Sequence, residues 1–265
     1  MSEAPICDFF ADEPIITPAK FHTNQNIQCD LQIKTAICTF LCENIDREQL
    51  QPILQDCRFL YYVYGRSGKV PIFQYKNLCL IVLMTVGSPV AAAVVEELHY
   101  LGIQNVIAYG TAGLLDDKID ADSFVLLEKA IRDEGASYHY CPPSLYVETD
   151  AELTVLLEKF LRQHGKVQRG ITWTMDALFR ETGQRKAKRM DQGAVVVEME
   201  CAGFAAAAKR LGLRFAEFVF FSDLLTNQAW TWTQNTTQNQ RRSLKVLLLN
   251  ELITFCPEIK LPKRG

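Results

Sequence analysis

Short apolar runs alternate with amphipathic segments along most of this chain. The run at 78–86 is nearly all apolar and the run at 215–221 is mostly apolar, as expected for strands covered on both faces. The segments at 90–101 and 150–164 indicate helices, and a glycine follows each of them as a stop signal. This alternation predicts an α/β fold, with a single-domain, three-layer α/β/α arrangement around a central mixed, mostly parallel twisted sheet.

Length and composition limit the class of protein. The chain has 265 residues and 48% hydrophobic content, which is enough for the core of one domain. Residues 1–30 are polar and irregular, and we expect them to form an ordered arm packed on the domain that residues 31–265 build. The net charge of −3 gives no indication of a nucleic-acid partner.

The N-terminal and cysteine patterns favour a cytoplasmic protein. Residues 1–10 have neither the basic region nor the long apolar core of a signal peptide. Because no apolar run approaches the ~18 residues of a membrane span, we expect no membrane partner. The nine cysteines include no CxxC pair and the four histidines show no metal-ligand spacing, so we expect reduced thiols and no metal.

The main candidate chemistry lies in residues 194–225. Glu198 and Glu200 follow one short apolar run, and Asp223 follows the next one, after a helix rich in small residues. If the two runs form parallel strands, their carboxyl ends open on the same side of the sheet, where ligands bind in open α/β folds. Carboxylates at the ends of buried strands are costly unless they are used or paired, so these three residues form a candidate site.

The order of this segment resembles the nucleoside phosphorylase superfamily. The matching features are Val197-Glu198-Met199-Glu200, the small-residue helix and then Ser222-Asp223. This superfamily contains purine nucleoside and uridine phosphorylases and the methylthioadenosine/S-adenosylhomocysteine nucleosidases. The resemblance implies an enzyme that cleaves the N-glycosidic bond of a nucleoside to free base and ribose 1-phosphate. It also implies inorganic phosphate as co-substrate, no cofactor and a homo-oligomer, as a dimer, trimer or hexamer.

The resemblance implies a role for each residue around the sugar. Cleavage leaves positive charge on the ribose and negative charge on the base, and groups placed at those charges accelerate it. Glu200 would accept hydrogen bonds from the ribose hydroxyls, Met199 would pack on the sugar, and Asp223 would give a proton to the leaving base. Glu198 either joins this ribose site or only pairs with a backbone amide or an arginine. His22 would reach the ribose of a neighbouring subunit.

The expected site for phosphate or water is less complete. The residues implied for it are Gly87, Thr111, Gly113 and Arg132, with Gly110 to Gly113 forming a loop after a strand at 105–109. The helix that follows Gly87 would offer free N–H groups to an anion. However, Ala108 replaces one arginine of the phosphorylases, and the Gly-Asp-Pro loop of the family is absent. A phosphorylase would then need Arg132 or Arg47, and a hydrolytic nucleosidase that uses water remains the alternative.

The base pocket is predicted on the segment that follows the strand at 167–174. The residues implied for base binding are Phe179, which would stack on the ring, and Arg180, Glu181, Gln184 and Asp223, which would contact its edge. Asp223 favours a purine, whereas Gly183-Gln184 resembles the uridine phosphorylases. Trp230 and Trp232 belong to either a lid or a surface loop. A non-catalytic nucleoside-binding protein is a third hypothesis, against which Glu200 and Asp223 argue.

Overall fold

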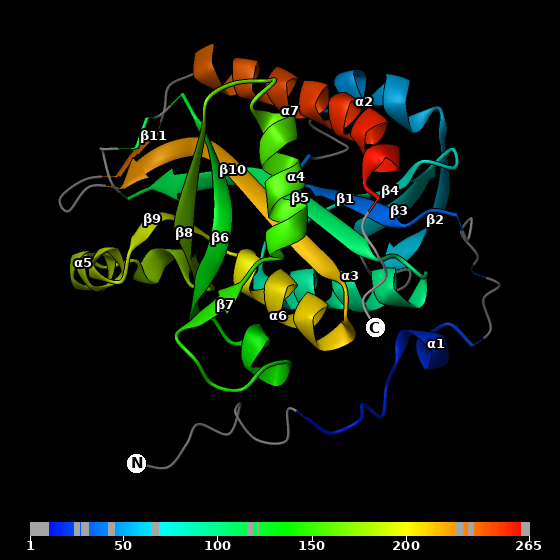
Figure 1. Cartoon of the computed structure of the whole chain (residues 1–265), viewed down its shortest axis with the longest axis horizontal. Coiled ribbons are helices and arrows are strands. Elements are labelled where there is room, and N and C mark those ends of the chain that lie inside the picture. Colours follow the sequence, from blue (N-terminus) through cyan, green and yellow to red (C-terminus); the bar gives the residue numbers. More distant parts are fainter. Residues whose placement is uncertain are drawn as a thin grey trace.

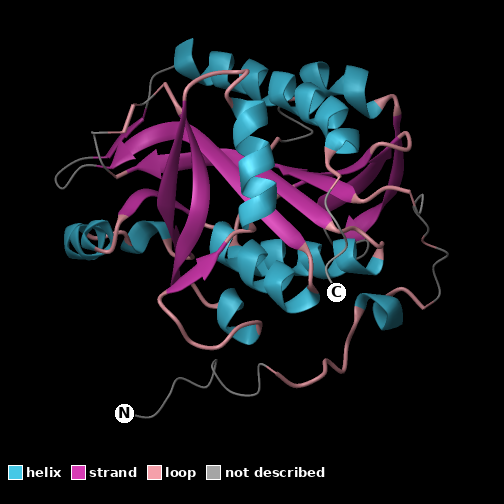
Figure 2. Ribbon diagram, in the orientation of Figure 1, coloured by secondary structure: helices cyan, strands magenta, loops and turns pink. Residues whose placement is uncertain are grey.

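A mixed β-sheet lies between two layers of helices (Figures 1 and 2). The computed structural model describes residues 11–23, 27, 32–41, 46–64, 69–115, 119–120, 122–225, 230–232 and 236–260. The strands are β1 (Thr35–Thr39), β2 (Cys57–Val63), β3 (Val70–Tyr75), β4 (Cys79–Leu83), β5 (Asn105–Leu114), β6 (Phe124–Asp133), β7 (Tyr146–Glu148), β8 (Val167–Met175), β9 (Ala194–Glu198), β10 (Arg214–Leu225) and β11 (Trp230–Trp232).

The helices alternate with these strands as predicted. They are α1 (Pro18–Phe21), α2 (Arg47–Leu54), α3 (Ser88–Tyr100), α4 (Ala151–Leu161), α5 (Gly183–Asp191), α6 (Cys201–Leu211) and α7 (Thr236–Phe255), with 3-10 turns η3 (Ala136–His139), η4 (Leu178–Arg180) and η5 (Cys256–Glu258). Within the described residues, none of them is both long and apolar enough to cross a bilayer.

The sheet has two parallel runs that meet in antiparallel pairings. β4, β1, β5 and β10 pair in parallel with one another, and so do β6, β8 and β9. β10 pairs antiparallel with β6, and β9 pairs antiparallel with β5, so strands β5, β9, β8, β6 and β10 close into a ring. The predicted mixed, mostly parallel sheet in a three-layer α/β fold is confirmed.

Each face of the sheet packs on its own helix layer (Figure 1). On β1, Ala36 and Cys38 belong to the core that contains α3 and α6, whereas Ile37 belongs to the core that contains α2, α4 and α7. Alternate residues of a strand point to opposite faces, so a strand buried on both faces is apolar throughout. α3 and α6 approach closely because Gly203 has no side chain; a Cβ there would lie 2.7 Å from the Ser88 carbonyl oxygen.

The two central strands are longer than the sequence predicted. β5 continues through residues 110–113, which were expected to form a loop, and β10 continues through Ser222 and Asp223. The physical reason is that β5 and β10 pair with each other in parallel as far as Leu114 and Leu224, so the ladder satisfies the backbone of both segments. The predicted lid or loop around Trp230 and Trp232 contains β11, which pairs antiparallel with the end of β10.

Residues 11–23 of the predicted arm lie along the helix layer formed by α3 and α6 (Figure 1). Arg210 of α6 donates a hydrogen bond to the carbonyl oxygen of Ala11 at 2.9 Å. His22 is 2% exposed, and its Nε2 atom lies 3.0 Å from a carboxylate oxygen of Glu97 on α3. Tyr61 donates to the same carboxylate at 2.9 Å. His22 is therefore buried in its own chain, which contradicts the prediction that it reaches a neighbour's ribose.

Candidate active site

A cavity of about 410 Å³ lies where the carboxyl ends of β5, β9 and β10 meet. The predicted residues that line it are Thr111, Gly113, Glu181, Glu198, Met199, Glu200 and Asp223. One cavity thus contains at least one residue expected to serve each of the sugar, the nucleophile and the base. No group of three or more His, Cys, Asp or Glu side chains in the described part of the chain is arranged to hold a metal ion.

The strands converge on this cavity by a different route from the predicted one. β9 and β10 were expected to be parallel, but β9 runs antiparallel to β5, to which β10 is parallel. β9 overlaps β5 only near the carboxyl ends of both strands, where Val197 pairs with Gly113. Asp223 is the partner of Gly113 on the other side. A Cβ on Gly113 would lie 3.0 Å from Val197 and 3.2 Å from the Asp223 carboxylate, so glycine permits this convergence.

A β-bulge sets the position of Asp223. Phe221 pairs with Ala112 and Asp223 pairs with Gly113, so Ser222 is an extra residue in β10. The Ser222 hydroxyl hydrogen-bonds to the Asp223 carboxylate and contacts the Ala112 carbonyl oxygen at 3.3 Å. Bulges of this kind redirect side chains next to active sites. Here the bulge lets Asp223 line the cavity while β10 continues to pair beyond it.

Backbone amides hold the Glu200 carboxylate at the start of α6. Gly87 donates its N–H to Glu200 Oε1 at 2.5 Å, and Met199 donates to Oε2 at 3.3 Å. Gly87 has φ +114°, a conformation that favours glycine. Burial and then the charge of Glu198 raise the pKa of Glu200 to about 8, although the two amides oppose this rise. Gly87 therefore binds Glu200 through its amide. It is not among the residues that line the cavity, where it was predicted to hold phosphate.

Glu198 is fully occupied by the protein itself. Its Oε1 accepts from the hydroxyls of Thr172 at 3.0 Å and Thr174 at 2.6 Å. Its Oε2 accepts from the amides of Glu200 at 2.6 Å and Cys201 at 2.7 Å. Of the two alternatives left open by the sequence, the backbone-amide pairing is the one that the structure contains. Glu198 thus fixes the first turn of α6 and the backbone of Glu200.

Glu181 and Asp223 are two acidic residues that line the cavity. Burial, followed by the charge of Asp223, raises the pKa of Glu181 to about 7. Glu181 therefore holds a proton over part of the neutral range while it lies close to Asp223. A carboxyl group with this pKa can donate a proton near neutral pH.

Arg132 does not reach the cavity, which contradicts its predicted role at the phosphate. It is 4% exposed, and its guanidinium stacks on the Tyr138 ring with 4.2 Å between Cζ and the ring centroid. It donates to the Ser137 hydroxyl at 2.8 Å and to the Pro142 carbonyl oxygen at 2.6 Å. Its hydrogen-bonding groups thus organise the segment after β6. For the alternative, Arg47, the structure describes the backbone alone.

The predicted base-binding residues separate into two groups. Glu181 lines the cavity together with Leu178, which the sequence analysis had not selected. Phe179 is 96% exposed, and Arg180 and Gln184 are also exposed on η4 and α5. Within this chain, these three side chains do not line the cavity, because η4 directs Leu178 rather than Phe179 toward it.

Two further residues that line the cavity, Lys245 and Glu217, carry ionisable groups and were not predicted from the sequence. Lys245 on α7 lies with its Nζ 3.4 Å from the Phe40 carbonyl oxygen and 5.9 Å from the centre of the Phe220 ring. Nothing in the local pattern of α7 singles out Lys245 from a helix-surface lysine. Glu217 did carry a signal, because it is the only charged residue of the apolar run 215–221.

Comparison with known proteins agrees with this geometry. A family model described as the phosphorylase superfamily matches residues 46–253. An uncharacterized protein of Acanthamoeba polyphaga mimivirus is 27% identical over 227 residues, which are 84% of this chain and 88% of that protein. The guanosine phosphorylase of Halorubrum lacusprofundi is 28% identical over 152 residues, which are 57% of this chain and 63% of that enzyme.

A solved structure shows the same fold. The 5'-methylthioadenosine/S-adenosyl homocysteine nucleosidase of Campylobacter jejuni superposes with a TM-score of 0.67 at 18% identity, covering 86% of this chain and 100% of that chain. The predicted resemblance to the nucleoside phosphorylase superfamily is confirmed. Because the family match extends over more than half of its length, this chain belongs to the phosphorylase superfamily.

Proposed function

We propose that the protein cleaves the N-glycosidic bond of a purine nucleoside by phosphorolysis, releasing free base and ribose 1-phosphate. The observation that carries this choice is the position of Lys245. Its ammonium group lies over Phe220, which pairs in the sheet with Thr111, and Lys245 and Thr111 line the same cavity as Glu200 and Asp223. A lysine and a hydroxyl residue that line one cavity supply the kinds of group that bind a phosphate anion.

The proposed reaction uses the two sides of the cavity differently. Phosphate held near Thr111 and Lys245 would form a new bond to C1′ while the C1′–N bond breaks. In its ionised form, which its raised pKa makes the major form only above about pH 8, Glu200 would accept hydrogen bonds from sugar hydroxyls and stabilise the positive charge on the ribose. The bonding electrons leave with the base, which takes up a proton from the Glu181–Asp223 pair. The products are a neutral base and ribose 1-phosphate.

The purine preference rests on Asp223 and Glu181, which line the cavity. A carboxyl group that holds a proton can donate it to a ring nitrogen of a purine. The related guanosine phosphorylase, named for a purine nucleoside, supports this preference.

Hydrolysis by water is the second candidate. The observation that favours it is that Arg132 is bonded elsewhere and that Ala108 lies in the core of the sheet, so neither position supplies an arginine to the cavity. In this case, water would take the place of phosphate near Thr111, and the products would be free base and free ribose.

A panel of nucleosides separates these functions. Guanosine, inosine, adenosine and uridine are incubated with and without phosphate, and free base and ribose 1-phosphate are measured. Phosphorolysis predicts that base release requires phosphate and is matched by ribose 1-phosphate. Base release that is unaffected by phosphate would instead establish the hydrolytic reaction.

Lys245 can be tested within the same assay. Lys245→Ala should raise the KM for phosphate about 10- to 100-fold, because one charge-assisted hydrogen bond is lost. Lys245→Arg should retain much of the affinity. Lys159→Ala, on the exposed surface of α4, is the matched control and should leave the KM unchanged. An unaltered phosphate KM in Lys245→Ala would remove Lys245 from the site.

The proposal includes a homo-oligomer. Leu178 lines the cavity and is 53% exposed, and the neighbouring Phe179 is 96% exposed. A second copy of the chain placed over η4 would cover both side chains and narrow the cavity entrance. Sedimentation velocity should then show a dimer or larger assembly, and Phe179→Asp should weaken it. A monomer at micromolar concentration would contradict this part of the proposal.

A further inference from the structure

Glu217 is a buried carboxyl group that the proposed reaction does not use. It lies in the middle of β10 and is 1% exposed, between Ala216 and Phe218 in the core of the sheet. Its side chain lines the same cavity as Glu200. Within the described residues, its Oε2 atom is fully buried and has no hydrogen-bond partner.

The surroundings of Glu217 favour its neutral form over its charged form. Burial, followed by the charges of Glu198 and Glu200, raises the pKa of Glu217 well above its usual range. The Cys201 thiol hydrogen-bonds to the Glu217 carboxyl and opposes this rise. A protonated carboxyl group can both donate and accept hydrogen bonds, so it pairs with a hydroxyl without adding another negative charge to the cavity.

An unpartnered polar atom in this position requires an explanation. A buried carboxyl oxygen that has lost its hydrogen bonds to water opposes folding unless another group replaces them. Almost all buried polar atoms in folded proteins therefore have partners, from the protein or from a bound molecule. Since Glu217 lines the cavity, the missing partner of its Oε2 would be supplied by whatever occupies the cavity.

The nearby Glu200 indicates the kind of partner. The charge of Glu200 contributes to the pKa shift of Glu217, so the two carboxyl groups lie in the same region of the cavity. We propose that Glu217 hydrogen-bonds a hydroxyl of the bound sugar. This inference rests on the proposed function, which places the sugar beside Glu200. Glu217 is then a specificity-determining residue, which favours nucleosides that carry this hydroxyl over the matching deoxynucleosides.

The proposal can be tested by binding rather than by turnover. Guanosine, 2′-deoxyguanosine and 3′-deoxyguanosine are titrated calorimetrically into the full chain carrying Asp223→Asn, so that the ligand is not consumed. Guanosine should bind about tenfold more tightly than one of the two deoxynucleosides, as expected for one buried hydrogen bond. Equal binding of all three nucleosides would overturn the proposal.

Substitutions then assign this preference to Glu217. Glu217→Gln can still donate and accept and should retain the preference for the hydroxyl. Glu217→Met has a similar length but no hydrogen-bonding group at that position, so the affinity ratio should fall toward one. Glu48→Gln, on the exposed face of α2, is the matched control. A wild-type affinity ratio in Glu217→Met would overturn the proposal.

Thermal unfolding distinguishes a ligand-binding role from a structural one. Glu217→Met should leave the Tm equal to or above that of the wild type, because an unpartnered polar atom is replaced by an apolar group. A Tm well below that of the wild type would assign Glu217 to the structure instead. Glu217→Leu is a second apolar variant should the methionine variant not fold.

The outcome is independent of the reaction. A protein whose preference for guanosine over a deoxynucleoside is lost in Glu217→Met, but which releases no base, would overturn the proposed function and retain the role of Glu217. Base release with no preference for the hydroxyl would do the opposite.

Discussion

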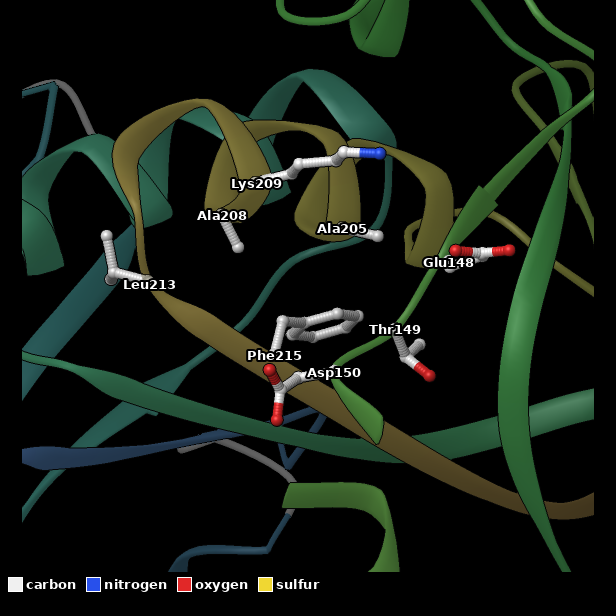
Figure 3. Close-up of a pocket in the computed structure, with 8 residues that line it drawn as sticks. All are labelled: Glu148, Thr149, Asp150, Ala205, Ala208, Lys209, Leu213 and Phe215. Atoms are coloured by element: carbon white, nitrogen blue, oxygen red, sulfur yellow. The ribbon is translucent and has the colours of Figure 1, made fainter. Parts of the chain in front are cut away.

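The two ends of β10 hold charged residues in opposite ways. At the start of β10, the Nε atom of Arg214 lies 3.6 Å from Oε2 of Glu152 and 4.0 Å from Oδ1 of Asp150. Asp150 also caps α4, since it accepts a hydrogen bond from the Leu153 amide at 2.8 Å. A hollow of about 160 Å³ lies beside these residues, between α6 and the start of β10 (Figure 3). Here opposite charges and a helix cap stabilise the junction of two elements.

At the other end of β10, several acidic residues line a larger cavity. Glu200 is held by backbone amides, and Glu181 lies near Asp223. The pKa values rise to about 8 for Glu200 and about 7 for Glu181, with burial as the main cause. Paired charges contribute to stability, whereas carboxyl groups that titrate near neutral pH are suited to proton transfer. The charged residues at the start of β10 therefore serve the fold, whereas those at its end have the pKa values that the proposed proton transfer needs.

The largest expected effect is at Asp223. Asp223→Asn should reduce kcat by about 10²–10⁴-fold, because proton delivery to the leaving base contributes a factor of that size. Its Tm should stay close to that of the wild type. The measurement is base release under saturating substrate. Full activity in Asp223→Asn would contradict the proposed role of the end of β10 in proton transfer.

Glu200→Gln should reduce kcat by about 10²–10³-fold. The amide cannot stabilise the positive charge of the ribose as a carboxylate does, although it preserves the shape of the side chain. Comparing kcat with KM for the nucleoside distinguishes transition-state stabilisation from simple binding. A change confined to KM would show that Glu200 only binds the sugar.

The raised pKa of Glu200 predicts how stability depends on pH. Above about pH 4.5 the unfolded chain releases this proton, whereas the folded protein keeps it until about pH 8. The resulting contribution of Glu200 to the free energy of unfolding is complete below pH 4.5. It is lost as the pH rises to 8, by at most about 1.4 kcal/mol per pH unit. In urea unfolding from pH 5 to 8, the free energy of unfolding should fall less steeply with pH in Glu200→Gln than in the wild type. Identical slopes would contradict the assignment.

The smallest effect is expected at the structural end. Asp150→Ala removes the side-chain cap of α4 and should lower the free energy of unfolding by about 1 kcal/mol. Activity should not change, because Asp150 lies away from the cavity that contains Glu200. Denaturant unfolding and kcat/KM measure the two quantities. A lower kcat/KM in Asp150→Ala, measured where the variant is fully folded, would show that the start of β10 affects the site at its end.

The sequence alone determined the alternation of strands and helices and the residues that make the site acidic. Apolar runs and helix stop signals are local, so β4, β5, β8, β9 and β10 and helices α3, α4 and α6 could be located before the structure was known. The short strands β7 and β11 were not predicted. Glu200 and Asp223 were found because each follows a buried strand in a family-like order. Both line the cavity.

Only the tertiary structure decided how these residues meet. The antiparallel overlap of β9 and β5, the bulge at Ser222 and the amide of Gly87 beneath Glu200 depend on pairings between distant segments. The same is true of Lys245, which α7 brings to the cavity, and of Arg132, which the segment after β6 holds away from it. Local hydrophobic periodicity specifies which face of an element is buried, but not the direction or the register of its partner.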